Sequence, residues 1–214
     1  EKSLSNKAVD VMFTQMSAKK GIKMFGERAV AAMFKEFKQL DQGPMVGKSV
    51  IGQVDPDKLS AAQKRGALSA VNLIKEKRNG KIKGRTCANG SKQKYYLKDG
   101  ESMASPTVSL EALITTLVID AAEGRDVATF DVPGAYLHAE MPKENQVLLK
   151  LHGEFVDIMC KVNPEYEKHV RHEGKKKVLY LQVLRALYGC IQSALLWYNL
   201  FSSTLEGMGF EINP

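Results

Sequence analysis

The strongest constraint on the fold is the segment Arg78-Asn79-Gly80, which separates two runs with the composition of β-strands, 71–77 and 81–88. Asn-Gly supplies the positive φ angles of a type I′ turn, so the sequence predicts a β-hairpin here. The hairpin is too polar for a protein core, and we expect it to project as a basic flap. Six basic residues lie on it: Lys75, Lys77, Arg78, Lys81, Lys83 and Arg85.

The positive charge of the chain is concentrated around this hairpin. Residues 61 to 98 hold eleven basic residues and one acidic residue, a net charge of +10, whereas the whole chain carries +7. The rest of the chain is therefore slightly acidic. A local basic surface favours a phosphate-bearing partner, because neutralised phosphates release their counterions. An ordinary solvated charged face is the alternative.

Helical and strand-like patterns are mixed along the chain, which predicts the α+β class. Asp41-Gln42-Gly43-Pro44 ends the first helical pattern, and Ser109 and Gly124 are suited to cap a later one. Residues 1–22 are interpreted as a linker or frayed helix, and 155–166 as helical or irregular. Helices are expected at 25–40, 60–68, 110–122 and 193–206, and further strands at 126–132, 146–151 and 178–184.

Composition excludes several classes of protein. No apolar run reaches the roughly 18 residues of a membrane-spanning helix, so no membrane partner is expected. No apolar leader follows Glu1, and the abrupt ends suggest a piece of a longer polypeptide. The three cysteines lack CxxC spacing, and the four histidines form no metal-binding pattern with them. We therefore expect no disulfide or zinc site, and an intracellular location.

The most informative single residue is Asp131. It ends an apolar run and is followed by Val132, Pro133 and Gly134, so its carboxylate is expected at the exposed tip of a strand. Mg²⁺ prefers oxygen ligands and is often held by one or two carboxylates together with substrate phosphates. An aspartate in this position is also a common turn residue or helix cap, so a purely structural role remains open.

Four segments resemble motifs of the copia-type (Ty1/copia) retrotransposon reverse transcriptases. Residues 131–137, Asp-Val-Pro-Gly-Ala-Tyr-Leu, resemble the family's first carboxylate motif. Residues 184–197, which contain Ala-Leu-Tyr-Gly and end in Trp, resemble a second motif, and 83–90 and 105–108 resemble two upstream motifs. The segments stand in the family's order and at about its spacing. The resemblance covers about 75–214, with a vaguer match back to Phe25.

The resemblance implies a fold and an organisation. The expected fold is α+β, with reverse-transcriptase-like fingers and an incomplete palm, as a fragment of a larger right-hand polymerase. Residues 1–22 would be the linker, 23–124 the fingers with the basic hairpin, and 125–214 the partial palm. The implied activity is RNA-directed DNA synthesis with Mg²⁺, using an RNA template, a DNA primer and deoxynucleotide triphosphates. The rest of the palm, a ribonuclease H and an integrase would come from the remainder of a polyprotein.

The resemblance also implies roles for individual residues. Asp131 would be a catalytic, metal-binding carboxylate, with the carbonyl of Val132 as a second ligand. Tyr136 would lie under the incoming sugar and exclude a ribose 2′-hydroxyl. Arg85, with Lys83, would bind the triphosphate, since a guanidinium meets phosphate oxygens as a fork. Nucleotide and template would meet at Tyr188 and Gly189, and nucleic acid would be gripped by Lys75, Lys77, Arg78 and Lys81.

The chain also departs from the family. After Tyr188-Gly189 the family commonly has Leu-Lys-Gln-Ala-Pro-Arg, whereas this chain has Cys-Ile-Gln-Ser-Ala-Leu. The family's Asp-Asp turn does not occur before Pro214, so we expect the chain not to polymerise DNA alone. Two alternatives follow: a non-catalytic nucleic-acid-binding remnant of a decayed or domesticated retroelement, or a plain α+β domain. The sequence does not distinguish a cytoplasmic particle from the nucleus.

Overall fold

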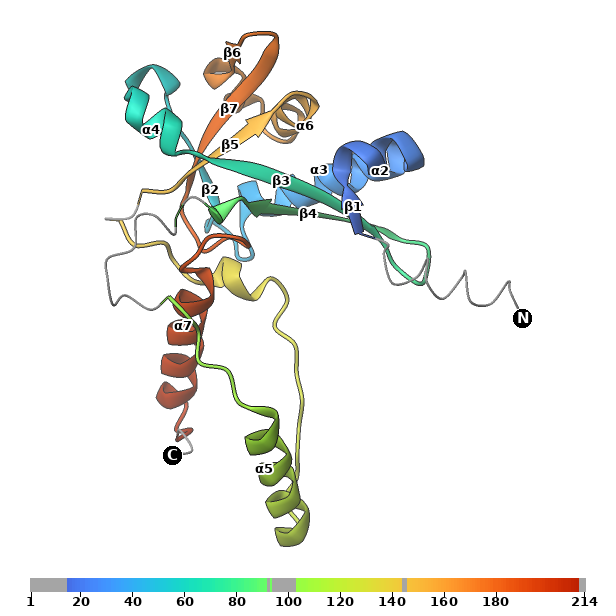
Figure 1. The fold of residues 1–214 in the computed structure, drawn as a ribbon, viewed down its shortest axis with the longest axis vertical. Coiled ribbons are helices and arrows are strands. Elements are labelled where there is room, and N and C mark those ends of the chain that lie inside the picture. The colour runs from blue at the N-terminus through green and yellow to red at the C-terminus, as the bar shows by residue number, and fades with distance from the viewer. Residues whose placement is uncertain (1–14, 92, 94–102, 144–145, 212–214) are drawn as a thin grey trace, which may run out of the picture.

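The chain folds into a mixed α/β structure (Figure 1). This computed structural model describes residues 15–91, 93, 103–143 and 146–211. The helices are α2 (Ala18–Phe25), α3 (Glu27–Gln42), α4 (Ala61–Gly66), α5 (Leu110–Glu123), α6 (Glu154–Val162) and α7 (Ser193–Gly207). The strands are β1 (Gln15–Ser17), β2 (Ile51–Gln53), β3 (Leu68–Glu76), β4 (Ile82–Ala88), β5 (Leu148–His152), β6 (Arg171–Glu173) and β7 (Lys176–Val183). The 3₁₀ turns that lie wholly within the described residues include η1 (Pro56–Lys58), η3 (Ala135–His138) and η4 (Pro164–His169).

A seven-stranded sheet organises the fold. Its order is β1-β3-β5-β7-β2, with β4 paired to β3 and β6 paired to β7. The β3–β5 pair is parallel and the other pairs are antiparallel. The main core contains residues of α3 and α6 together with strand residues such as Leu149 and Leu179, which are at most 1% exposed. The nearly continuous apolar run of β7 is buried on both faces, as predicted.

The expected boundary between residues 124 and 125 does not divide this sheet. Strand β3, from the expected fingers, pairs with β5, from the expected palm. The core likewise joins Phe37 and Leu181 in one cluster. Residues 1–22 were interpreted as a linker or frayed helix. From Gln15 onwards the segment is ordered: β1 begins at Gln15 and α2 at Ala18, which is fully buried. Residues 1–14 lie outside the described part.

The predicted hairpin forms, but its turn differs from the expected type. Among the described residues only glycines have positive φ, so Asn79 keeps a negative φ and a type I′ turn is excluded. The Gly80 N–H donates to the Lys77 carbonyl at 2.8 Å, and Gly80 has φ +71°. This pattern matches a type I turn followed by a left-handed glycine, the usual three-residue hairpin loop.

The hairpin is anchored by α3 along one face. A Cβ added to Gly84 would lie 2.8 Å from the carbonyl oxygen of Ala32, so the close approach of strand and helix requires glycine. At the tip, the Arg28 guanidinium donates to the Gly80 carbonyl at 2.6 Å. Lys75, Lys83 and Arg85 alternate with the positions that face α3, so their side chains lie on the opposite face. The flap therefore does not project freely.

The strand expected at 126–132 does not form. Residues 125–132 have no strand partner in the described part of the chain, and 121–131 are exposed. An apolar run becomes a strand only where another strand supplies hydrogen-bond partners. Asp131 therefore follows an extended, unpaired segment.

Helix α5 forms as predicted but stands apart from the sheet (Figure 1). Ser109 caps it, accepting a hydrogen bond from the Ala112 N–H at 3.1 Å, and Gly124 ends it with φ +65°. Its apolar residues are open to solvent, with Leu110 71% exposed and Val118 63% exposed. No helix within the described ranges has both the length and the apolar character needed to cross a membrane.

Candidate nucleotide and nucleic-acid site

The side chains of Arg85 and Tyr136, which come from separate parts of the chain, both lie against the ring of Tyr188. The guanidinium carbon of Arg85, on β4, lies 5.1 Å from the centre of the Tyr188 ring. The ring of Tyr136, on η3, lies 4.7 Å from the same ring, with 36° between the two planes. A cation over an aromatic face is attracted by the ring quadrupole, so this stack is favourable as it stands. It presents a guanidinium beside two flat aromatic surfaces.

The charges around the Tyr188 hydroxyl show which other groups are near. Burial raises the pKa of Tyr188, and the positive charge of Arg85 opposes that rise. Tyr136, Glu36 and Asp131 raise the Tyr188 pKa further. Of these groups Asp131 has the smallest effect on Tyr188, and its carboxylate lies within electrostatic range of the Tyr188 hydroxyl. Arg85, Tyr136, Tyr188 and Asp131 are called the Tyr188 cluster below.

A tight backbone joint holds Tyr188 beside the end of β4. The Ala88 N–H donates to the Tyr188 carbonyl at 2.7 Å. Gly189 has φ +91°, and a Cβ there would lie 2.0 Å from the Ala88 carbonyl oxygen. A Cβ on Gly90 would lie 2.1 Å from the Gly189 carbonyl oxygen. Two glycines are therefore required for this contact, which fixes the Tyr188 loop against the basic hairpin.

Asp131 is exposed and free to bind a ligand. Its carboxylate forms no hydrogen bond or ion pair with the described residues, and Val132 beside it is half-buried. Gly134, with φ +63°, turns the chain into η3 and so carries Tyr136 back toward Tyr188. A single open carboxylate and a nearby carbonyl fit a Mg²⁺ ion that arrives with a triphosphate. The described residues contain no group of three potential ligands that would hold a metal in advance.

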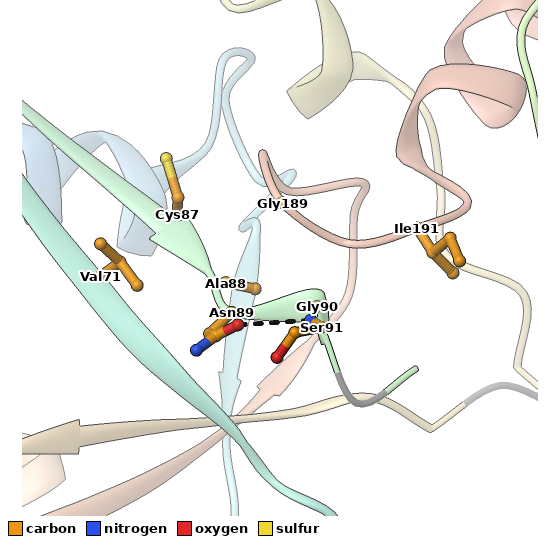
Figure 2. Close-up of a pocket in the computed structure, with 8 residues that line it drawn as sticks. All are labelled: Val71, Cys87, Ala88, Asn89, Gly90, Ser91, Gly189 and Ile191. Carbon is orange, nitrogen blue, oxygen red and sulfur yellow. Dashed lines mark hydrogen bonds between the residues drawn. The ribbon is translucent and has the colours of Figure 1, made fainter. Parts of the chain in front are cut away.

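A pocket of about 600 Å³ lies next to the joint (Figure 2). Val71 and Cys87 extend from the two hairpin strands on one side, and Ile191 lies on the opposite side (Figure 2). Burial raises the pKa of the Cys87 thiol, so that group stays neutral at physiological pH. The pocket is lined by Val71, Cys87, Ala88, Asn89, Gly90, Ser91, Gly189 and Ile191. Its mixture of apolar side chains and open backbone suits a flat, uncharged group such as a nucleobase.

The remaining predicted basic residues divide into two sets. Lys75 and Lys83 face each other across the hairpin and, with Arg85, line a small hollow of about 100 Å³. Lys77, Arg78 and Lys81 are exposed at the hairpin tip, away from the Tyr188 cluster. Lys75 and Lys83 can therefore extend the positive surface of the Tyr188 cluster. The tip residues can reach only a ligand that extends beyond the cluster.

Sequence reasoning missed Glu36, which supports β4 from α3. The Glu36 carboxylate accepts a hydrogen bond from the Thr86 N–H at 2.9 Å, one residue from Arg85. Burial raises the pKa of Glu36, while the Thr86 hydrogen bond and the charges of Lys83 and Arg85 lower it. Glu36 thus satisfies the open edge of β4 at the position that carries Arg85. In the sequence, Glu36 stands out only as a charged residue beside the apolar face of an amphipathic helix.

Arg185 was also missed, although it lies within the motif that contains Tyr188. It is 5% exposed and donates to the His138 carbonyl at 2.6 Å and to the Glu140 carboxylate at 2.9 Å. These bonds tie the segment after β7 to η3 and so help to bring Tyr136 to Tyr188. A lone charge in the apolar run 178–187 is the signal that could have identified it.

Comparison with known proteins yields no match to any family model, curated protein or solved structure.

Proposed function

We propose that this chain is part of an RNA-directed DNA polymerase of the copia type, and that the Tyr188 cluster binds the incoming deoxynucleotide triphosphate. The supporting observation is that Arg85 and Tyr136, expected from two separate motifs, both contact Tyr188 from a third. The negative charge of Asp131 also acts on Tyr188. In the proposed reaction the primer 3′-hydroxyl attacks the α-phosphate and pyrophosphate leaves. Such reactions depend mainly on positioning and on neutralising phosphate charge.

Each residue has a role suited to its chemistry. The Arg85 guanidinium pairs with phosphate oxygens as a fork, with Lys83 adding charge. Asp131 and the Val132 carbonyl hold the Mg²⁺ that accompanies the triphosphate; when bound, this ion neutralises developing charge on the phosphates. The Tyr136 ring lies under the sugar and leaves no space for a 2′-hydroxyl, and Tyr188 supports it from below.

The uncovered apolar surface supports a role within a larger polymerase. Phe130 is 71% exposed, and the apolar residues of α5 are similarly open. Contiguous exposed apolar patches commonly mark interaction surfaces. In the proposed protein the remaining palm covers them, with ribonuclease H and integrase elsewhere in the polyprotein and with RNA template and DNA primer as partners.

A second candidate is a non-catalytic nucleic-acid-binding remnant. It is favoured because the described residues contain no group of three potential metal ligands, whereas two-metal chemistry needs more ligands than Asp131 alone supplies. Both candidates would bind nucleic acid, but only the polymerase would bind a deoxynucleotide triphosphate.

The test is equilibrium binding of a fluorescent deoxynucleotide triphosphate to the chain with primer–template and Mg²⁺. Arg85→Ala should weaken nucleotide binding at least about tenfold, equivalent to 1.4 kcal/mol. Arg78→Ala is the matched control, since it removes the same charge from the same hairpin but from its tip. Asp131→Asn should remove the Mg²⁺ dependence and leave primer–template binding unchanged.

The outcomes separate the candidates. Equal nucleotide affinity for Arg85→Ala and Arg78→Ala would overturn the assigned cluster. Tight primer–template binding without measurable nucleotide binding would favour the remnant. Tyr136→Ala should reduce discrimination against ribonucleotides, a readout that a purely structural tyrosine would not change.

A further inference from the structure

One side of helix α7 carries two aromatic rings that contact the segment from Phe130 to His138. Trp197 and Phe201 lie four residues apart on α7, and their ring centres are 5.4 Å apart with 25° between the planes. Side chains at this spacing lie on the same side of a helix. The Phe130 ring centre lies 6.1 Å from that of Phe201, and the His138 ring centre lies 6.3 Å from that of Trp197. These four rings are called the α7 aromatic cluster below.

The α7 aromatic cluster contacts both ends of the segment that carries Asp131 and Tyr136. Phe130 directly precedes Asp131, and His138 follows Tyr136 by two positions. A carbonyl oxygen can only accept a hydrogen bond, so the Nε2 of His138 carries the hydrogen in its 3.2 Å contact with the Pro133 carbonyl. This hydrogen bond closes the turn between Asp131 and Tyr136. The aromatic contacts thus hold the two ends of the segment, and the hydrogen bond holds its turn.

The start of this segment depends on the aromatic contacts more than its end does. At the end, the backbone is also held by the Arg185 guanidinium, which donates to the His138 carbonyl at 2.6 Å. The start, by contrast, belongs to exposed chain that has no strand partner within the described ranges. The contact between Phe130 and Phe201 therefore fixes the position of the neighbouring Asp131.

We propose that Trp197 is a positioning residue for the nucleotide site. Its ring supports Phe201 and His138, which hold the two ends of the segment. Asp131 and Tyr136, which lie between those ends, are thereby kept at the spacing that a metal-bound triphosphate requires. The inference rests on the proposed function, which places that nucleotide at the Tyr188 cluster.

The effect of Trp197 on binding is indirect. A protein whose binding-competent state is only partly populated binds its ligand with an affinity reduced by that fraction. Without the Trp197 ring, the segment should hold Asp131 and Tyr136 in place together for less of the time. Nucleotide affinity should therefore fall although no contact to the nucleotide is removed.

The test is binding of a fluorescent deoxynucleotide triphosphate, with Mg²⁺ and primer–template, to variants of the 214-residue chain. Trp197→Leu should weaken nucleotide binding about fivefold or more, the scale of one aromatic contact, and leave primer–template binding unchanged. Trp197→Phe keeps an aromatic ring at this position and should restore binding to within about twofold of the parent. Tyr198→Leu is the matched control, because it removes an aromatic ring about 100° further round the same helix.

A second measurement separates positioning from a general loss of stability. In an Asp131→Asn background, Trp197→Leu should reduce nucleotide affinity about twofold or less, because residues that act through one another have non-additive effects. Phe201→Leu removes the other ring on α7 and should give the same pattern. Urea unfolding shows whether each variant folds, and Phe201→Leu decides the result if Trp197→Leu does not fold.

The outcomes distinguish this inference from the proposed function. Equal nucleotide affinity for Trp197→Leu and Tyr198→Leu, or an undiminished loss in the Asp131→Asn background, would overturn the positioning role of Trp197. Arg85→Ala would still weaken nucleotide binding in either case, so the proposed function would stand. Absence of nucleotide binding by the parent chain would overturn both.

Discussion

Substitution of Gly189 by alanine should be among the most damaging single changes in this fold. The new Cβ would lie 2.0 Å from the Ala88 carbonyl oxygen, and the residue would have to hold φ +91°. The left-handed backbone alone costs about 1–2 kcal/mol for a residue with a Cβ. Relief of the contact requires the loop to move, which breaks the 2.7 Å hydrogen bond from Ala88 to Tyr188. Leaving such buried groups unpaired costs about 1–3 kcal/mol, so the total is about 2–5 kcal/mol.

Gly209 provides a matched control, because it has the same φ of +91° and an added Cβ would meet nothing within 4 Å. Urea unfolding followed by circular dichroism gives the free energy of unfolding of each variant. Gly209→Ala should lower the free energy of unfolding only by the backbone cost, whereas Gly189→Ala should lower it by about 1–3 kcal/mol more. Gly189→Ala should also weaken nucleotide binding, since Tyr188 moves away from Arg85. Equal losses for the two variants would refute the joint between β4 and the Tyr188 loop.

Three further predictions concern buried polar groups. Arg185→Met should lower the free energy of unfolding by about 2–3 kcal/mol, since a charged hydrogen bond to a buried carbonyl is lost; an unchanged urea midpoint would contradict this. Tyr166→Phe should cost about 1–2 kcal/mol, because the hydroxyl donates to Asp41 at 2.7 Å, and thermal denaturation checks it. The raised pKa of Glu36 means that its buried charge opposes folding at neutral pH and that this penalty fades as pH falls toward 4.5. Glu36→Gln should therefore be at least as stable as the parent at pH 7, with any advantage shrinking toward pH 4.5; a growing advantage on acidification would contradict the sign.

The sequence predicted the elements whose signals are local. The hairpin, α5 with its Ser109 cap, and the amphipathic α3 all depend on turn residues, caps and periodicity within a short segment. The type of hairpin turn was wrong because Asn79 can adopt either sign of φ, and only the packed strands decide between them. The strand at 126–132 was wrong for a related reason, since a strand depends on a partner that local pattern does not reveal.

The sequence motifs predicted the central residues of the Tyr188 cluster but not the residues that support them. The motifs pointed to Arg85, Tyr136 and Tyr188, and these three side chains are in contact. The supporting residues were missed because their roles depend on distant neighbours: Glu36 serves a strand edge fifty positions away, and Arg185 bonds to a turn on another segment. No local pattern distinguishes such residues from ordinary surface charges.

Asp131 should hold a metal-bound nucleotide at one site together with Arg85, Tyr136 and Tyr188. Paramagnetic broadening by Mn²⁺, recorded in amide NMR spectra with and without a deoxynucleotide triphosphate, tests it most directly. The strongest nucleotide-dependent broadening should fall on the amides of Asp131, Val132 and Tyr136, and should disappear in Asp131→Asn. Broadening centred elsewhere, or unchanged in Asp131→Asn, would contradict the claim.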